Sequence, residues 1–156
     1  MTQRTVDYDA IVRVIRLYID AFNDNDVSKL QEAFDADAWI FFIDADGGLC
    51  YEGKAGKVID PRKECWPQAE AVVGFLNAFQ LSHDAKYLEA ARRVWDYIEQ
   101  HLVDRVHGEW FWRINADGRP DPELPKISEW KGPYHGSRAC LETLRRLKAI
   151  DPMQPL

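Results

Sequence analysis

Residues 87–104, YLEAARRVWDYIEQHLVD, carry the pattern that decides the fold. Their apolar side chains recur at the spacing of one face of an α-helix, and the charged residues between them occupy the opposite face. The apolar set is Tyr87, Leu88, Ala91, Val94, Trp95, Ile98 and Leu102. We therefore predict an amphipathic helix that packs its apolar face against a neighbouring helix.

A second helix is predicted just before it, in residues 63–81, KECWPQAEAVVGFLNAFQL. A glycine, a short aromatic strand and a polar loop precede this helix, and the same order returns later in the chain. Lys63 and Trp66 of the first copy correspond to Lys126 and Trp130 of the second, at an offset of roughly 60 residues. Two interpretations are open: a repeated hairpin–helix–helix unit that stacks on its neighbours, or a chance match between common turn residues.

The N-terminal region has a different pattern. Residues 7–26, DYDAIVRVIRLYIDAFNDND, predict a long helix with these apolar residues at helical spacing: Ile11, Ile15, Tyr18 and Phe22. Asp26 is a suitable N-cap for a second, short helix over residues 27–34. The apolar run AWIFFID lacks a helical period and is typical of a buried strand, and DADGG is typical of a turn.

The composition is that of a folded globular protein of 156 residues, with 46% hydrophobic and 29% charged residues. The length allows one ordinary domain or two small ones. A net charge of -6 without a basic cluster disfavours nucleic acid and anionic membranes as partners. The N-terminal residues MTQRTVDYDA hold no apolar run, so neither a signal peptide nor a membrane anchor is predicted. The cysteines have no CxxC spacing, which favours a reducing, cytoplasmic location.

The sequence predicts neither a cofactor nor a metal. It contains no Gly-rich phosphate loop, no G-x-S-x-G nucleophile motif and no cluster of metal-ligating residues. The segment NADGRPDPE has scattered acidic residues but lacks the ordered spacing of a calcium-binding EF-hand loop.

His135 is the first candidate for chemistry. It follows WKGPY in residues 128–142, SEWKGPYHGSRACLE, where a loop enters a predicted helix. An imidazole can take and return a carbon-bound proton near neutral pH, and the alternative is a structural histidine that bonds a backbone carbonyl. Glu70, one helical turn after Trp66, is either a partner that orients an imidazole or a partner of the helix dipole.

Trp66 and Trp130 occupy matching places in the two copies. They are either core residues or a pair that stacks against the apolar face of a pyranose ring. Arg138 and Glu142 have helical spacing and predict a surface ion pair. The remaining histidines fall at helix ends or in loops and are not predicted to be catalytic: His83, His101 and His107.

Five segments between residues 44 and 148 occur in the order and spacing of a known family. They are GGLCYEG, KECWPQAEAVVGFLNAFQL, YLEAARRVWDYIEQHLVD, GEWFWRINADG and WKGPYHGSRACLETLRRL. This region resembles the C-terminal third of the N-acylglucosamine 2-epimerase family, which includes cellobiose 2-epimerases and aldose–ketose isomerases. The resemblance implies an (α/α)6 toroid with a metal-free active site at one end.

In that family a histidine removes the proton next to the carbonyl of the open-chain sugar, and a second histidine returns it on the other face of the enediolate. The resemblance implies that His135 is one of these histidines and that Glu70 is the carboxylate near the imidazole. It also implies that Trp66 and Trp130 contact the sugar. The family's other histidine lies in a GH…E motif that this sequence lacks. Cys65 stands where the family usually has a tryptophan, which changes the wall of the sugar site.

Residues 5–47 are similar to the beginning of nuclear transport factor 2-like (SnoaL-like) domains, through F-x-x-x-D, F-x-x-D-A and DG motifs. The rest of such a domain has no counterpart after residue 50. We therefore expect a mainly α fold in three parts, as a gene fusion, a fragment or a chimera would give. Residues 1–45 form an α–α–β segment, residues 46–150 form two incomplete (α/α)6-toroid-type helix pairs with short β-hairpins, and residues 151–156 form a tail.

The predicted function is that of a sugar 2-epimerase or isomerase. It removes and returns the C2 proton of N-acylglucosamine, mannose or a β-1,4-linked disaccharide, with little or no activity from the partial chain. The alternatives are a non-enzymatic small-molecule-binding or oligomerising module, in which the N-terminal helices bind another copy, and a fusion fragment without activity. The expected partners are a small sugar and a second copy of the chain.

Overall fold

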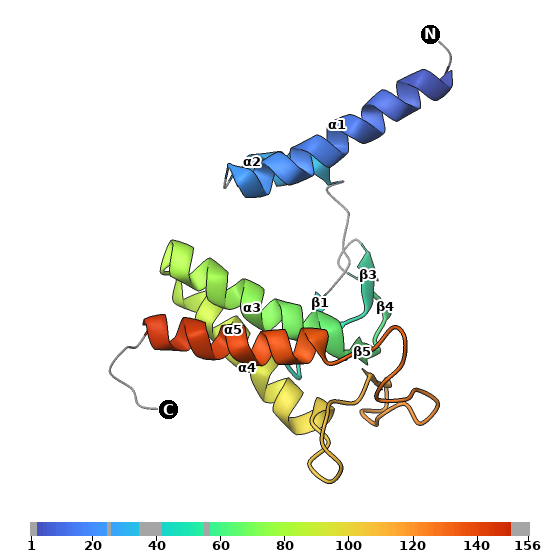
Figure 1. Cartoon of the computed structure of the whole chain (residues 1–156), viewed down its shortest axis with the longest axis vertical. Helices are drawn as coiled ribbons and strands as arrows, with labels where there is room; N and C mark the ends of the chain where they lie inside the picture. The colour runs from blue at the N-terminus through green and yellow to red at the C-terminus, as the bar shows by residue number, and fades with distance from the viewer. Residues whose placement is uncertain (1–2, 25, 35–41, 55–56, 151–156) are drawn as a thin grey trace. The chain divides into compact units, whose positions relative to one another are not determined.

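Helices dominate the protein, which confirms the predicted mainly α class (Figure 1). The computed structural model divides into two compact units, residues 1–38 and 39–156. The residues that it describes are 3–24, 26–34, 42–54 and 57–150.

The described residues of the first unit form two helices, α1 (Gln3–Asn23) and α2 (Val27–Ala33). The predicted N-cap of the second helix is confirmed, because Oδ1 of Asp26 accepts hydrogen bonds from the hydroxyl of Ser28 at 2.6 Å and from its backbone N–H at 3.0 Å. These bonds lower the pKa of the Asp26 carboxyl. The predicted apolar face of α1 stays exposed at three of its positions: Ile11, Ile15 and Tyr18. The side chain of Phe22 lies outside the described residues.

The second unit is built on α3 (Cys65–Ser82), which packs against both α4 (Ala85–Tyr97) and α5 (Tyr134–Ile150) (Figure 1). A π-helical turn, η1 (Ile98–Leu102), continues α4. The two helices predicted from the sequence pattern are therefore confirmed. The second sequence copy contributes α5 alone, so the described residues hold one helix pair and one further helix instead of two pairs.

Six short strands in the second unit form three antiparallel pairs among the described residues. The pairs are β1 (Phe42–Ile43) with β2 (Leu49–Cys50), β3 (Glu52–Lys54) with β4 (Lys57–Asp60), and β5 (Lys63–Glu64) with β6 (Arg113–Ile114). The strand predicted over AWIFFID is described only at β1, and its earlier residues lie outside the described part. The β5–β6 pair joins the two sequence copies directly in front of α3.

The predicted apolar stripe supplies the core. Its fully buried members pack with Val72 and Leu76 of α3: Ala91, Val94, Ile98 and Leu102. Gln68 is also buried, and its amide exchanges two hydrogen bonds with the backbone of Leu49, at 2.7 and 2.8 Å. A buried side-chain amide needs such partners, so these bonds hold β2 against the start of α3.

Asp104 is a buried carboxylate that holds the loop after η1. It forms an ion pair with Lys126 and accepts hydrogen bonds from the backbone N–H groups of Val106 at 2.8 Å and His107 at 3.1 Å. The Lys126 bond, followed by the two backbone bonds, holds the pKa of Asp104 well below its usual range. The corresponding lysine of the first copy, Lys63, forms equivalent ion pairs with acidic residues of the DADGG turn.

Acidification is expected to destabilise the fold through Asp104. Its pKa is lower in the folded state than in the unfolded state, so its stabilising contribution is present above about pH 4 and is lost as the pH falls below that value. Urea denaturation at about pH 6 and at about pH 3 should therefore show that the free energy of unfolding falls more in the wild type than in Asp104→Asn. Glu123→Gln, an exposed carboxylate, should follow the wild type. If the free energy of unfolding fell equally in Asp104→Asn and in the wild type, the pH dependence could not be attributed to Asp104.

Candidate active site

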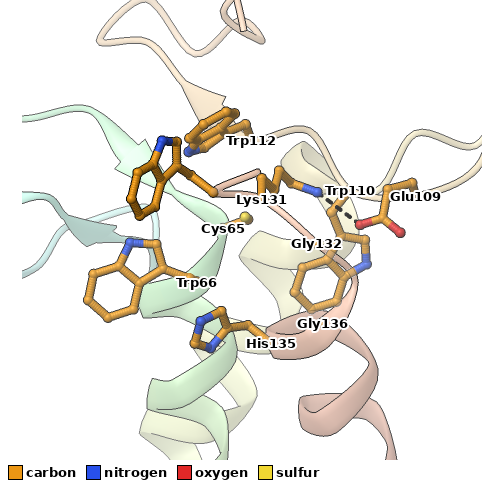
Figure 2. Close-up of a pocket in the computed structure, with 10 residues that line it drawn as sticks. Cys65, Trp66, Glu109, Trp110, Trp112, Lys131, Gly132, His135 and Gly136 are labelled. Atoms are coloured by element: carbon orange, nitrogen blue, oxygen red, sulfur yellow. Dashed lines mark hydrogen bonds and ion pairs between the residues drawn. The ribbon is translucent and has the colours of Figure 1, made fainter. Parts of the chain in front are cut away.

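A pocket of about 340 Å³ lies between the start of α3, the loop after η1 and the loop before α5 (Figure 2). Four indole rings give it an aromatic wall, and an imidazole, a thiol and one ion pair complete it. The lining residues are Cys65, Trp66, Glu109, Trp110, Trp112, Trp130, Lys131, Gly132, His135 and Gly136. Three of the four predicted site residues therefore line a single cavity, and the fourth, Glu70, lies directly behind its imidazole.

His135 is held by Glu70. It is the second residue of α5, and its Nδ1 lies 2.8 Å from Oε1 of Glu70, which projects from the second turn of α3. The ring of Trp66 lies 5.9 Å from the imidazole between centroids, and that of Tyr134 lies 5.0 Å away. The partner of His135 is therefore a carboxylate and not a backbone carbonyl. Glu70 lies beyond the first turn of α3, where a carboxylate gains little from the helix dipole.

Arg138 completes the arrangement, and this corrects a prediction. Its Nη1 donates to Oε2 of Glu70 at 2.6 Å, so the predicted pair of Arg138 with Glu142 is wrong. The reason is that Arg138 lies one turn after His135 on α5, and both therefore face the carboxylate on α3. Glu142 pairs with Arg145 instead, at 2.8 Å.

The contact with Glu70 decides which nitrogen of His135 can act as a base. A carboxylate accepts a hydrogen bond from Nδ1–H, which leaves the lone pair on Nε2. Arg138 compensates the charge of the same carboxylate, which lowers the cost of keeping it half-buried. His135 itself lines the pocket.

The two predicted tryptophans line the pocket, but they differ in how far they are exposed. Trp130 is 83% exposed, which excludes the core alternative for this residue. Trp66 is half-buried, and its indole N–H donates to Oε2 of Glu64 at 3.1 Å. Arg113 binds the other oxygen of this buried carboxylate at 2.5 Å. The orientation of Trp66 is thus determined by a hydrogen-bond chain that begins on β6.

Six lining residues had not been predicted: Trp110, Trp112, Glu109, Lys131 and the glycines Gly132 and Gly136. The two tryptophans had a usable signal, because residues two apart in an extended segment point to the same face. The ion pair of Lys131 with Glu109 joins two loops and had no such signal. Cys65 lies in the same wall, and burial raises the pKa of its thiol to about 11, so the thiol stays protonated near neutral pH.

The other histidines are not among the residues that line the pocket. His83 ends α3 in a left-handed conformation, and His101 stacks on Tyr97 with 4.6 Å between ring centroids. His107 contacts Asp104. Across the part of the chain that the structure describes, no group of three or more potential metal ligands occurs, and no helix has the length and apolarity of a membrane span.

The sequence pattern of N-acylglucosamine 2-epimerase (GlcNAc 2-epimerase) matches residues 29–138. The chain belongs to the N-acylglucosamine 2-epimerase family. The predicted resemblance to this family is therefore confirmed. The match begins within residues 5–47, whose similarity to nuclear transport factor 2-like domains stays a prediction.

Curated sugar 2-epimerases are similar to this chain. The cellobiose 2-epimerase of Dictyoglomus turgidum is 41% identical over 119 residues, which is 76% of this chain and 28% of the relative. The N-acylglucosamine 2-epimerase of Bos taurus is 32% identical over 110 residues, 69% of this chain and 25% of the relative. The chain thus spans about a quarter of the length of these relatives.

Solved structures agree with the family assignment. Cellobiose 2-epimerase from Spirochaeta thermophila is 46% identical with a TM-score of 0.62, over 67% of this chain and 26% of that one. A D-mannose isomerase gives a TM-score of 0.63 at 23% identity, over 83% of this chain and 34% of that one, and shows a shared fold.

Proposed function

We propose that this member of the N-acylglucosamine 2-epimerase family carries half of a sugar 2-epimerase or isomerase active site, with His135 as the base. The observation that carries the proposal is the chain of contacts from Arg138 to Glu70 to His135, which ends in a pocket lined by four tryptophans. The named activities of the relatives support an aldose as substrate: cellobiose, N-acylglucosamine or mannose.

The geometry supports the following chemistry. Nε2 of His135 takes the proton from C2 of the open-chain aldose, and the electrons of the C–H bond form the C1–C2 double bond of an enediolate. Glu70 stabilises the imidazolium that results. Return of the proton to the same face restores the substrate, and its delivery to the opposite face gives the epimer. His135 is the only histidine among the described residues that line the pocket, so we expect exchange to be faster than epimerisation.

Exchange in D2O tests this function. The purified chain is incubated with cellobiose, N-acetylglucosamine or mannose, and the C2 proton signal of each sugar is followed by NMR. We expect the signal to decline for at least one sugar with little epimer formed. Folded protein that leaves the C2 proton of all three sugars in place would overturn the proposal.

The architecture of the longer relatives supports a further part of the same proposal. The chain covers 26% to 34% of the matched solved structures at TM-scores of 0.62 and 0.63. We infer that α3, α4 and α5 correspond to one segment of an (α/α)6 toroid, in which further helices complete the pocket.

A second candidate function, self-association, is favoured by an apolar groove of about 760 Å³ between α4 and α5. A second copy offers α1 as its occupant. Helix α1 has 21 residues and is about 31 Å long, so it can extend along α3, whose 18 residues span about 27 Å and contribute to the groove lining. The apolar face of α1 is exposed. The groove is lined by Val72, Leu76, Ala85, Leu88, Glu89, Ala91, Arg92, Trp95, Cys140, Thr143, Leu144 and Leu147.

Sedimentation velocity tests the self-association. Leu144→Glu places a charge in the groove and is expected to convert a dimer to a monomer, because burying an unpaired carboxylate is costly. Ile15→Glu on α1 should do the same. Leu141→Glu, on an exposed position of α5 outside the groove lining, should leave the dimer intact. A monomeric wild type would overturn this second candidate.

A further inference from the structure

Lys131 and Glu109 form the one ion pair among the described residues that line the pocket. The ammonium of Lys131 lies 2.9 Å from Oε1 of Glu109, and Figure 2 shows this contact in the wall beside Trp110. Lys131 is only 5% exposed, whereas the Glu109 side chain is 33% exposed. A lysine ammonium has three N–H donors, so one bond to Glu109 leaves two for a ligand.

Fold stability alone does not account for this pair. An ion pair removed from water usually stabilises a protein no more than apolar side chains of the same size, because both charges lose their hydration. Glu109 in addition has a φ of 65°, a left-handed conformation that a residue with a Cβ adopts at a cost. Backbone strain of this kind concentrates at binding and catalytic sites.

Both partners are held in place by their loops. The carbonyl of Glu109 accepts the N–H of Asp104 at 2.9 Å. On the other side, Lys131 bonds Ser128 twice, through its N–H to the hydroxyl at 3.1 Å and through its carbonyl to the backbone N–H at 3.0 Å. The pair is therefore positioned before a ligand arrives, which reduces the entropy lost on binding.

We propose that Glu109 and Lys131 determine the substrate specificity of the pocket. Lys131 donates hydrogen bonds to sugar oxygens, and Glu109 cancels its charge so that uncharged sugars bind in preference to sugar phosphates and sugar acids. This inference rests on the proposed sugar site. A second contact next to the pocket is also neutral overall, because Arg138 compensates the charge of Glu70 behind the imidazole.

Tryptophan fluorescence tests the inference without relying on proton exchange, because four indoles line the pocket. Wild-type protein, Lys131→Met and Glu109→Gln are titrated with cellobiose, mannose, glucose 6-phosphate and gluconate. Lys131→Met should weaken binding of the neutral sugars about tenfold, as the loss of a hydrogen bond from a charged donor does. Glu109→Gln leaves Lys131 uncompensated and should gain about tenfold in affinity for the two anions.

The double variant Glu109→Gln/Lys131→Met removes both charges at similar volume and serves as the folding control. It should unfold in urea near the wild-type midpoint and bind neutral sugars as weakly as Lys131→Met does. Unchanged affinities in both single variants would overturn the inference, as would a wild type that binds none of the four ligands. Sugar binding that depends on Lys131 in a protein without C2 exchange would overturn the proposed catalysis while supporting the specificity role.

Discussion

Replacing His135 with alanine is expected to abolish exchange of the C2 proton. No other histidine among the described residues lines the pocket, so the variant loses the only imidazole that can take the proton there. General acid–base groups of this kind contribute about 100-fold or more to a rate, which places the residual exchange near the solvent background. The measurement is the D2O experiment with the wild type and the variant side by side at equal concentration.

His101→Ala is the matched control, because His101 stacks on Tyr97 outside the pocket and should leave exchange unchanged. Glu70→Gln keeps the size of the side chain but removes the carboxylate that orients the imidazole. It should lower exchange by about 10-fold to 100-fold without abolishing it. Exchange that persists in His135→Ala at the wild-type rate would remove His135 from the mechanism.

Replacing Leu102 with alanine is expected to lower the free energy of unfolding by about 2–5 kcal/mol, as large-to-small changes in a packed core do. Leu102 is fully buried at the end of η1, and the missing side chain leaves a cavity among the core residues of α3 and α4. The loss is a large fraction of the about 5–15 kcal/mol that a domain typically has. Urea denaturation followed by circular dichroism measures it.

The effect of Leu102→Ala should also reach the pocket. The carbonyl of Leu102 accepts the backbone N–H of Phe111 at 2.8 Å, and Val103 pairs with Trp110 in an isolated bridge. A shift of this backbone therefore moves the aromatic wall. Leu81→Ala, at a side chain that is 62% exposed, is the control and should change the stability by a few tenths of a kcal/mol. A loss in Leu102→Ala no greater than that of the control would contradict the core assignment.

The candidate site was partly predictable because its residues lie in recognisable local contexts. His135 stands where a loop enters a helix, and Trp66 and Trp130 stand at equivalent positions of two similar segments. The structure brings these three residues to one cavity and places Glu70 against the imidazole. The exchange of partners at Arg138 was not predictable, because helical spacing reveals neighbours on one helix only. The carboxylate that Arg138 binds lies on another helix.

What the sequence determined by itself is the set of local elements. The apolar period of residues 87–104, the cap at Asp26 and the turn at DADGG depend on residues within a few positions of one another, and all three are found in the structure. Only the tertiary structure decided which side chains meet. The contact between Arg138 and Glu70 joins positions 68 apart, and that between Glu109 and Lys131 joins positions 22 apart. Such contacts depend on how α3 packs against α5 and how two loops close over them, and no local pattern encodes that geometry.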